Sequence, residues 1–236
     1  MFTTVDHVVA LHGFAGSGRS WDRVAEALGG EWRVHAPDLP ASLEDCVAAA
    51  QDGAPERFVL AGYSMGGRVA LHVALAVPQR IERLVLVSTT GGIEDPAERE
   101  ARRAADEELA KRIEAGTIEE FADVWTAQPL FADDPPEVVA RWREELRRNR
   151  PASLAASLRG LGAGVLPPVW DELGALSMPA TVVVGERDAK YRAIGERLVS
   201  VLPEAAPAIV VPGAGHGLLR EAPEAVARAI AAGSSR

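Results

Sequence analysis

Residues 58–71 read Phe58-Val59-Leu60-Ala61-Gly62-Tyr63-Ser64-Met65-Gly66-Gly67-Arg68-Val69-Ala70-Leu71. The apolar run at 58–61 is typical of a strand that is buried on both faces. Ser64 follows it inside a G-x-S-x-G pattern, and a helix-like run comes next. Glycines on either side of the serine allow the strand and the helix to approach closely. We therefore expect a sharp turn that presents Ser64 at the carboxyl end of a strand, where open parallel sheets bind ligands.

Apolar runs elsewhere predict five more strands, separated by helical patterns. The expected strands cover residues 7–11, 32–36, 81–88, 180–185 and 207–212. Helices are expected at 20–28, 43–50 and 221–232, with Ser20 as the N-cap of the first. Strands that alternate with helices indicate a doubly wound, mostly parallel sheet. Together with the G-x-S-x-G turn, this pattern resembles the α/β-hydrolase fold.

Residues 93–161 interrupt the alternation of strands and helices. They show helical patterns, many charges and prolines at expected turns, namely Pro129, Pro135 and Pro136, but no strand-like run. This segment is too long for a single crossover, so we expect an inserted helical cap over the carboxyl ends of the strands. The α/β core would then comprise residues 1–92 and 162–236.

The composition of the 236-residue chain limits the possible partners and cofactors. A formal net charge of −9 argues against nucleic acid or an anionic membrane as the main partner. With Cys46 as the single cysteine and no signal peptide or membrane-spanning segment recognised, a cytoplasmic location is expected. Neither a metal-binding cluster nor a dinucleotide fingerprint is present, so we expect no metal and no organic cofactor.

Two residues late in the chain complete a catalytic triad with Ser64. Asp188 follows the strand expected at 180–185, and the glycine-flanked His216 follows the last strand, giving the chain order Ser, Asp, His. A serine hydroxyl needs a base, which His216 can provide, and Asp188 would orient the imidazole. Glu186 and Asp95 are the alternative acids. Strand alternation points Glu186 elsewhere, whereas Asp95 follows the preceding strand.

Two loops near Ser64 bear on the stabilisation of a developing oxyanion. The strand at 7–11 runs into His12-Gly13-Phe14-Ala15-Gly16-Ser17-Gly18, where related folds place a backbone donor. The N–H groups of Phe14 and Met65 are therefore the candidate donors. The loop Asp38-Leu39-Pro40 lacks the Gly-His-Gly continuation common in α/β-hydrolases.

Arg68 provides a clue to the substrate. It follows Ser64 by four residues, so it lies on the same face of the expected helix, beneath the cap. A cation beside the nucleophile suits a substrate that carries a carboxylate, which arginine binds bidentately. The alternative is a surface arginine paired with a glutamate of the cap.

Motifs along almost the whole chain resemble the 2-succinyl-6-hydroxy-2,4-cyclohexadiene-1-carboxylate synthase family of menaquinone biosynthesis. The specific motifs are the arginine in G-Y-S-x-G-G-R and the pattern in the cap. The matching segments are 11–18 with Trp21, 62–70, Phe121, Trp125, Pro129-Leu130-Phe131, 154–162, Trp170, 185–191 and 214–216.

The resemblance implies a lyase that eliminates pyruvate from 2-succinyl-5-enolpyruvyl-6-hydroxy-3-cyclohexene-1-carboxylate. It implies that three arginines hold the three carboxylates of this anionic substrate. By position these are Arg68, Arg102 and Arg147, with Arg148 as the alternative to Arg147. It further implies that the pocket is lined by Trp125, Tyr63 and Tyr191.

The implied reaction begins with proton abstraction. Ser64, made basic by His216 and Asp188, would remove the ring proton α to the succinyl ketone, and pyruvate would leave by elimination across the ring.

Two alternative functions remain open from the sequence. One is a serine hydrolase of small esters, thioesters or carbon–carbon bonds, and the other is a non-catalytic ligand-binding module. The sequence is compatible with a monomer or a small homo-oligomer.

Overall fold

The computed structural model describes residues 6–128, 131 and 134–233. Its strands form a six-stranded parallel sheet with the order β2-β1-β3-β4-β5-β6. Their bounds are β1 Asp6–Leu11, β2 Trp32–His35, β3 Phe58–Tyr63, β4 Ile81–Val87, β5 Ala180–Gly185 and β6 Ile209–Val211. The strand that precedes Ser64 is central, so the serine is positioned by the most buried part of the sheet.

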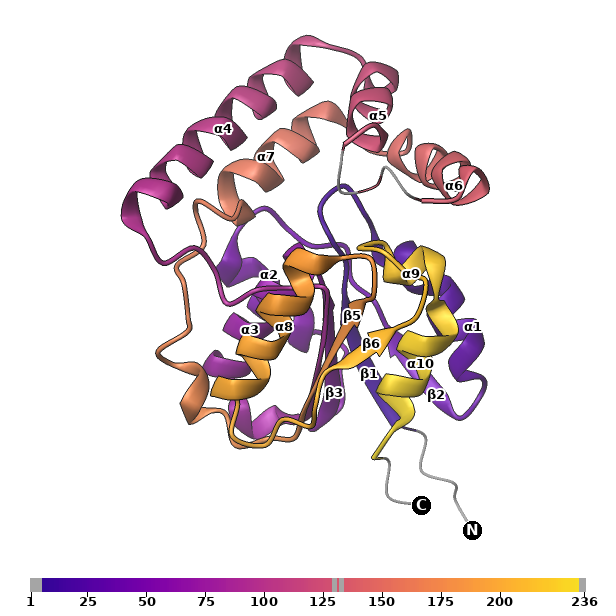
Figure 1. The fold of residues 1–236 in the computed structure, drawn as a ribbon, viewed down its shortest axis with the longest axis vertical. Coiled ribbons are helices and arrows are strands. Elements are labelled where there is room, and N and C mark those ends of the chain that lie inside the picture. The colour runs from indigo at the N-terminus through magenta and orange to yellow at the C-terminus, as the bar shows by residue number, and fades with distance from the viewer. Residues whose placement is uncertain (1–5, 129–130, 132–133, 234–236) are drawn as a thin grey trace.

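Helices cover both faces of the sheet, with α2, α3 and α8 on one face and α1 and α10 on the other (Figure 1). The side chains of β3 alternate between the two sides: Leu60 packs with α2, α3 and α8, whereas Val59 packs with α1 and α10. The bounds are α1 Asp22–Leu28, α2 Leu43–Gln51, α3 Met65–Ala76, α8 Ala189–Val201 and α10 Pro223–Ala231, with shorter helices η1 Gly18–Trp21, η2 Pro78–Arg80, η4 Leu173–Ala175 and α9 Leu218–Glu221. This arrangement confirms the predicted α/β-hydrolase type of fold.

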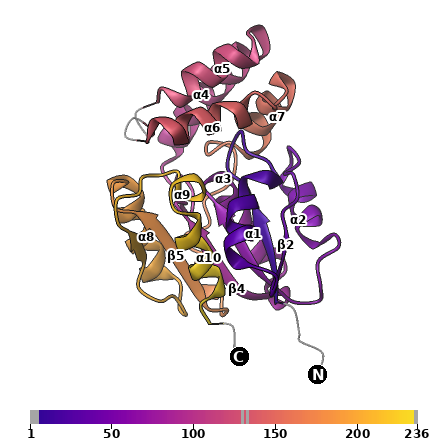
Figure 2. The ribbon, with the colours of Figure 1, turned by 90° about the vertical axis from the view of Figure 1, so that its right-hand side faces the viewer.

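Four helices between β4 and β5 lie above the carboxyl ends of the strands (Figures 1 and 2). They are α4 Pro96–Ala115, α5 Ile118–Thr126, α6 Pro136–Leu146 and α7 Pro151–Leu161. Proline opens three of them, where a missing N–H costs no helical hydrogen bond. Thr117 and Glu120 form a capping box that starts α5. These helices have a hydrophobic cluster of their own and are called the cap below; the predicted division of the chain at 93 and 161 stays a prediction.

Two helix boundaries differ from those predicted. Ser20 is not the N-cap of α1; it lies inside the 3₁₀-helix η1, and its hydroxyl accepts a hydrogen bond from the Ser17 N–H. The closing helix begins at Pro223, two residues later than predicted, and the short α9 precedes it. Proline favours the first turn of a new helix because it cannot continue an existing hydrogen-bond ladder. Within the described ranges, no helix has the length and apolar character that a membrane crossing requires.

The cap contacts the core through a close approach between two backbone segments. Gly160 lies in α7, and a Cβ atom built on it would lie 1.6 Å from the carbonyl oxygen of Ala41. Ala41 precedes Ser42, the N-cap of α2. A side chain at residue 160 would therefore push the cap away from the core.

We predict that Gly160→Ala destabilises the protein by about 1–3 kcal/mol, the usual cost of overpacking. This direction opposes the intrinsic preference of helices for alanine over glycine, which is about 1 kcal/mol. Gly174→Ala is the matched control, because no atom lies within 4 Å of a Cβ built there. Thermal and urea unfolding measure both variants. A Gly160→Ala protein as stable as the wild type would refute this contact.

Candidate active site

Ser64 lies at a strained turn between β3 and α3. Its φ angle is +52°, in the left-handed region that non-glycine residues rarely adopt. Close backbone contacts maintain the turn, since a Cβ atom at Gly62 would lie 2.5 Å from the Gly66 carbonyl oxygen, and one at Gly66 would lie 2.2 Å from that of Leu11. Both glycines are therefore required by packing, and the serine is fixed at the start of α3.

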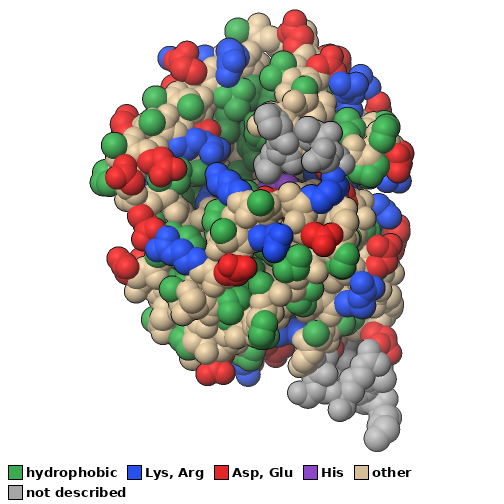
Figure 3. All heavy atoms as spheres, viewed as in Figure 1, with side chains coloured by type: hydrophobic (Ala, Val, Ile, Leu, Met, Phe, Trp, Pro, Cys, Tyr) green, Lys and Arg blue, Asp and Glu red, His purple; other side chains and the backbone are tan. Residues whose placement is uncertain are grey.

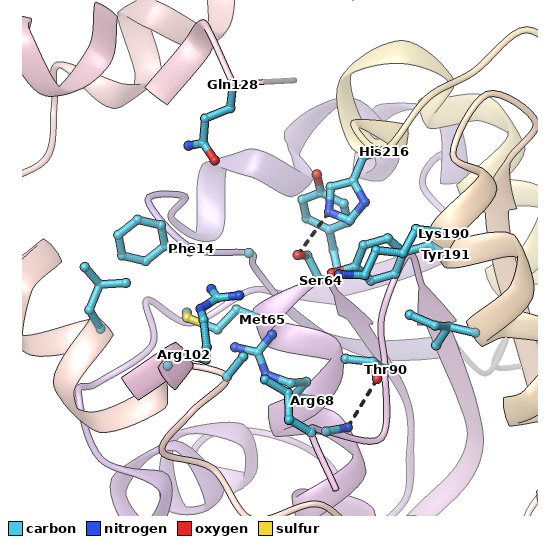
Figure 4. Close-up of a pocket in the computed structure, with 18 of the residues that line it drawn as sticks. Phe14, Ser64, Met65, Arg68, Thr90, Arg102, Gln128, Lys190, Tyr191 and His216 are labelled. Atoms are coloured by element: carbon cyan, nitrogen blue, oxygen red, sulfur yellow. Dashed lines mark hydrogen bonds between the residues drawn. The ribbon is translucent and has the colours of Figure 1, made fainter. Parts of the chain in front are cut away.

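The structure brings Asp188 and His216 together with Ser64. The Nδ1 atom of His216 lies 2.7 Å from Oδ2 of Asp188, and its Nε2 atom lies 3.2 Å from Oγ of Ser64 (Figure 4). A carboxylate only accepts hydrogen bonds, so Nδ1 carries the imidazole proton and Nε2 is free to accept from the serine. Both Asp188 and His216 are buried. The arrangement can thus withdraw a proton from Ser64, as a general base requires.

The two alternative acids have other hydrogen-bond partners. The Glu186 carboxylate accepts a hydrogen bond from the Gly213 N–H at 2.8 Å. Asp95 caps α4 by accepting from the Glu98 N–H at 2.8 Å. Asp188 in turn accepts from the Tyr191 N–H at the start of α8. Of these acids, Asp188 is the one hydrogen-bonded to His216.

A cavity of about 750 Å³ opens beside Ser64, between the cap and the core. The space-filling view shows a hollow below the cap with basic side chains near it (Figure 3). Nine of the residues predicted for the site line this cavity. They are Phe14, Tyr63, Ser64, Met65, Arg68, Arg102, Trp125, Tyr191 and His216.

Arg68 lies beneath the cap, on the same side of α3 as Ser64 (Figure 4). Its Nη2 donates to the Leu161 carbonyl at 3.0 Å, and its buried Nε has no hydrogen-bond partner. Burial lowers the pKa of the guanidinium to about 10, against the opposing effects of Tyr191 and Asp106, so the group remains charged at neutral pH. The alternative of a pair with a cap glutamate is wrong, because no described carboxylate lies within ion-pair distance of Arg68.

Arg102 of α4 enters the same cavity from the cap. Its Nε donates to Oδ1 of the buried Asp106 at 2.8 Å, one helical turn away. The side chain of Arg102 is 47% exposed. This bond fixes the stem of Arg102 and leaves the other guanidinium nitrogens available.

Arg147 is not part of the cavity lining, contrary to the prediction. Its Nη1 donates to the exposed Glu144 at 2.6 Å. The buried stripe of α6 comprises Val138, Trp142 and Leu146, at four-residue spacing. Arg147 comes one residue after this stripe, about 100° further around the helix. Its alternative, Arg148, is also exposed and absent from the lining.

His12 links the loop of Phe14 to the loop at residues 38–40. Its Nδ1 lies 2.8 Å from the Gly13 carbonyl, and its Nε2 accepts from the Leu39 N–H at 2.9 Å. Burial lowers the pKa of His12, which keeps the ring neutral for this role. Asp38 accepts from the Gly18 N–H at 2.8 Å. These bonds fix the short loop without the Gly-His-Gly continuation.

The sequence analysis missed several lining residues, among them Phe131, Trp142, Arg197 and Arg220. The position of Arg220, four residues after His216, could have indicated that its side chain lies near the site. The matching residues Pro129 and Leu130 lie outside the described residues. Among the described residues, no group of histidine, cysteine or acidic side chains is arranged to hold a metal ion. That no cofactor takes part stays a prediction.

Glu221 was also not anticipated from the sequence. Its carboxylate accepts hydrogen bonds from the N–H groups of Gly215 at 2.8 Å and Gly217 at 2.9 Å, which flank His216. The side chain is 5% exposed and pairs with Arg187 at 2.6 Å. Glu221 therefore holds the backbone of the histidine loop in place.

Comparisons with known proteins agree with this geometry. The model of the alpha/beta hydrolase family matches residues 8–229. A 2-succinyl-6-hydroxy-2,4-cyclohexadiene-1-carboxylate synthase of Klebsiella pneumoniae is 33% identical over 243 residues, covering 95% of this chain and 92% of the relative. The structure of MenH from S. aureus is 27% identical with a TM-score of 0.88, covering 97% of this chain and 93% of that one. A thermophilic esterase from Thermogutta terrifontis is 28% identical with a TM-score of 0.79, covering 97% and 89%.

We predict that Glu221→Gln slows the reaction of Ser64 with a fluorophosphonate probe by about tenfold or more, because hydrogen bonds to charged groups contribute about 1.5–3 kcal/mol. A glutamine has one acceptor oxygen, so it cannot serve both flanking N–H groups. Glu224→Gln is the matched control, since Glu224 is exposed. Equal labelling rates in a folded Glu221→Gln protein would show that the histidine loop needs no such support.

Proposed function

Because the chain belongs to the α/β-hydrolase family and, within it, to the 2-succinyl-6-hydroxy-2,4-cyclohexadiene-1-carboxylate synthases, we propose that it eliminates pyruvate from 2-succinyl-5-enolpyruvyl-6-hydroxy-3-cyclohexene-1-carboxylate in menaquinone biosynthesis. One observation supports this lyase reaction most directly. It is the half-buried Arg68 beside Ser64, whose buried Nε has no hydrogen-bond partner, with Arg102 in the same cavity.

Cations in the cavity beside Ser64 favour an anionic substrate over a neutral ester. A charge held away from water is costly unless a partner compensates it. The Nε atom of Arg68 has no hydrogen-bond partner. Arg102 donates to Asp106 through Nε, which leaves its two terminal nitrogens for a ligand. Both guanidinium groups can therefore form charge-assisted hydrogen bonds with carboxylates. A substrate with several carboxylates would be held by these bonds with its ring beside Ser64.

Proton removal is the first chemical step of the proposal. His216 takes the hydroxyl proton of Ser64 through Nε2, and the Asp188 carboxylate stabilises the resulting imidazolium through Nδ1. The serine oxygen then removes the ring proton α to the succinyl ketone. The electron pair moves onto the ketone oxygen as an enolate. When the carbonyl reforms, the electrons move through the ring double bond, the ring C–O bond breaks and pyruvate leaves as its enolate. The proton held by the His216 imidazolium balances the protonation of this enolate at its methylene carbon, which gives pyruvate and restores the neutral histidine.

Two backbone groups are proposed to stabilise the ketone oxygen as it becomes negative. They are the N–H groups of Phe14 and Met65, whose residues both line the cavity. Met65 is the first residue of α3, where an N–H has no acceptor within the helix and the helix dipole favours negative charge. Fixed donors of this kind need no reorganisation during the reaction.

Aromatic side chains are proposed to enclose the substrate ring. Trp125 belongs to the cap and packs on Phe14, with ring centroids 4.9 Å apart. Tyr63 and Tyr191 lie on the core side near His216. Burial raises the pKa of both phenols, so they are neutral at physiological pH. We also propose that the reaction takes place in the cytoplasm without a cofactor, on a small anionic substrate.

Ester hydrolysis is the second candidate, favoured by the likeness to the Thermogutta terrifontis esterase. The same arrangement of Ser64, His216 and Asp188 can attack an ester carbonyl. Hydrolysis passes through a covalent acyl-Ser64, whereas the lyase reaction forms no covalent bond to the serine. Detection of an acyl intermediate therefore separates the two candidates.

We predict that the protein releases pyruvate from its substrate far faster than the Ser64→Ala variant. The substrate is generated in situ by the preceding pathway enzyme, and pyruvate is measured by a coupled assay. The variant is the necessary baseline because the substrate also decays spontaneously to the same product. A wild-type rate equal to that of Ser64→Ala would refute the lyase and make a panel of esters and thioesters the next experiment.

We predict that Arg68→Ala lowers kcat/KM by a factor of about 10 to 150, since one charge-assisted hydrogen bond contributes about 1.5–3 kcal/mol. Arg112→Ala is the matched control, an exposed arginine on the cap helix α4 that is absent from the cavity lining. Unchanged kinetics in Arg68→Ala would contradict the role of this cation in substrate binding.

A further inference from the structure

Arg220 is a cation in the cavity that the proposed function does not yet use. It belongs to α9 and lines the cavity together with Tyr63 and His216. Its side chain is 14% exposed. Its guanidinium carbon lies 3.9 Å from the ring centroid of Trp142 and 5.7 Å from that of Phe131, and these two rings contact each other. These ring contacts, a long ion pair with Asp134 at 3.9 Å and an interaction with the Tyr63 hydroxyl hold the group in place.

The guanidinium of Arg220 has unused hydrogen-bonding capacity. Its Nε and Nη2 atoms are buried and have no hydrogen-bond partner. The Asp134 carboxylate lies 3.9 Å from Nη2, too far for a hydrogen bond, and its Oδ2 is also without a partner. Of the other acids near Arg220, Glu221 is bonded to Arg187 and the histidine loop, whereas Glu145 interacts with the guanidinium electrostatically. These two buried donors are available to an acceptor that enters the cavity.

Arg220 lies on a different side of the reacting serine from Arg68 and Arg102. Figure 4 shows Arg68 and Arg102 on the side of Ser64 away from His216. Arg220 instead shares aromatic neighbours with His216: Phe131 lies 6.1 Å from the imidazole and Tyr63 5.6 Å, measured between ring centroids. Carboxylates held at both places would stretch the substrate across Ser64.

We propose that Arg220 is a specificity-determining residue that binds one carboxylate of the substrate on the His216 side of the cavity. This inference rests on the proposed function, which supplies a substrate with three carboxylates. Arg220 would then take the place that the resemblance assigned to Arg147. An arginine stacked on aromatic rings keeps its in-plane N–H groups free, which suits bidentate binding of a carboxylate.

Asp134 would be the counterion of Arg220 until the substrate binds. Burial and the adjacent Glu221 carboxylate raise the pKa of Asp134 to about 6, whereas Arg220 and Arg187 act in the opposite direction. Asp134 is therefore largely ionised at neutral pH and competes with an incoming carboxylate. Removal of its charge should strengthen binding of an anion, an effect that a purely structural Arg220 would not produce.

Kinetics and direct binding test the proposal with the full-length protein. Arg220→Gln and Arg220→Lys are compared with Arg141→Gln, an exposed arginine next to Trp142 on α6 that is absent from the cavity lining. We expect Arg220→Gln to raise KM by about tenfold or more. Arg220→Lys should restore part of this loss, because it keeps the charge but not the bidentate geometry. Circular dichroism confirms that each variant is folded.

Calorimetric titration with pyruvate and with the dicarboxylate product identifies which carboxylate is held. A weaker affinity of Arg220→Gln for either compound supports the site, and Asp134→Asn should bind that compound more tightly than the wild type. Unchanged KM and unchanged affinities for both compounds in folded Arg220→Gln would overturn the proposal.

The proposed function and this proposal fail in different ways. A wild type that releases no pyruvate refutes the lyase. Titration with citrate still tests the anion site in that case, because it needs no turnover. Citrate binding that depends on Arg220 would uphold the site, and citrate binding that does not would overturn it.

Discussion

The close backbone contact between β1, β3 and α3 is the constraint on which the site depends. The Gly66 position abuts the Leu11 carbonyl, and Gly62 abuts the first turn of α3. This contact leaves Ser64 at a φ of +52° and starts a helix at the next residue. The serine, a candidate oxyanion donor and Arg68 one turn later are all placed by this single turn. The strain is sustained by a sheet that is buried on both faces.

The cavity beside Ser64 is lined by arginines, although the molecule as a whole carries a net negative charge. The chain has a formal charge of −9, yet Arg68, Arg102 and Arg220 line one cavity. Each of them is fixed differently, by a backbone carbonyl, by a buried acid one turn away, or by aromatic stacking. All three retain hydrogen-bonding capacity beyond these contacts. A local field of this kind selects a small anion while the surface repels larger polyanions.

Local sequence patterns and family motifs were sufficient to predict the strands, the helices and the candidate catalytic residues. Ser64, Asp188 and His216 follow strand ends, and parallel strands bring such ends together, so their proximity could be anticipated. The orientation of Arg147 could not be predicted, because a shift of one residue along α6 turns a side chain to a different face of the helix. Arg220 was missed because its aromatic neighbours Trp142 and Phe131 come from the region of the cap, 78 and 89 residues earlier in the chain. Packing of the cap on the core is a tertiary property that no local pattern encodes.

In the proposed mechanism Ser64 acts as a base toward carbon and not as an acylated nucleophile. The most direct test uses substrate with deuterium at the ring carbon next to the succinyl ketone. Pyruvate formation is followed in a single turnover, and the intact protein is weighed by mass spectrometry at the same times. We expect slower pyruvate formation from the deuterated substrate and no mass added to the protein. Equal rates together with an accumulating acyl-Ser64 would contradict this mechanism.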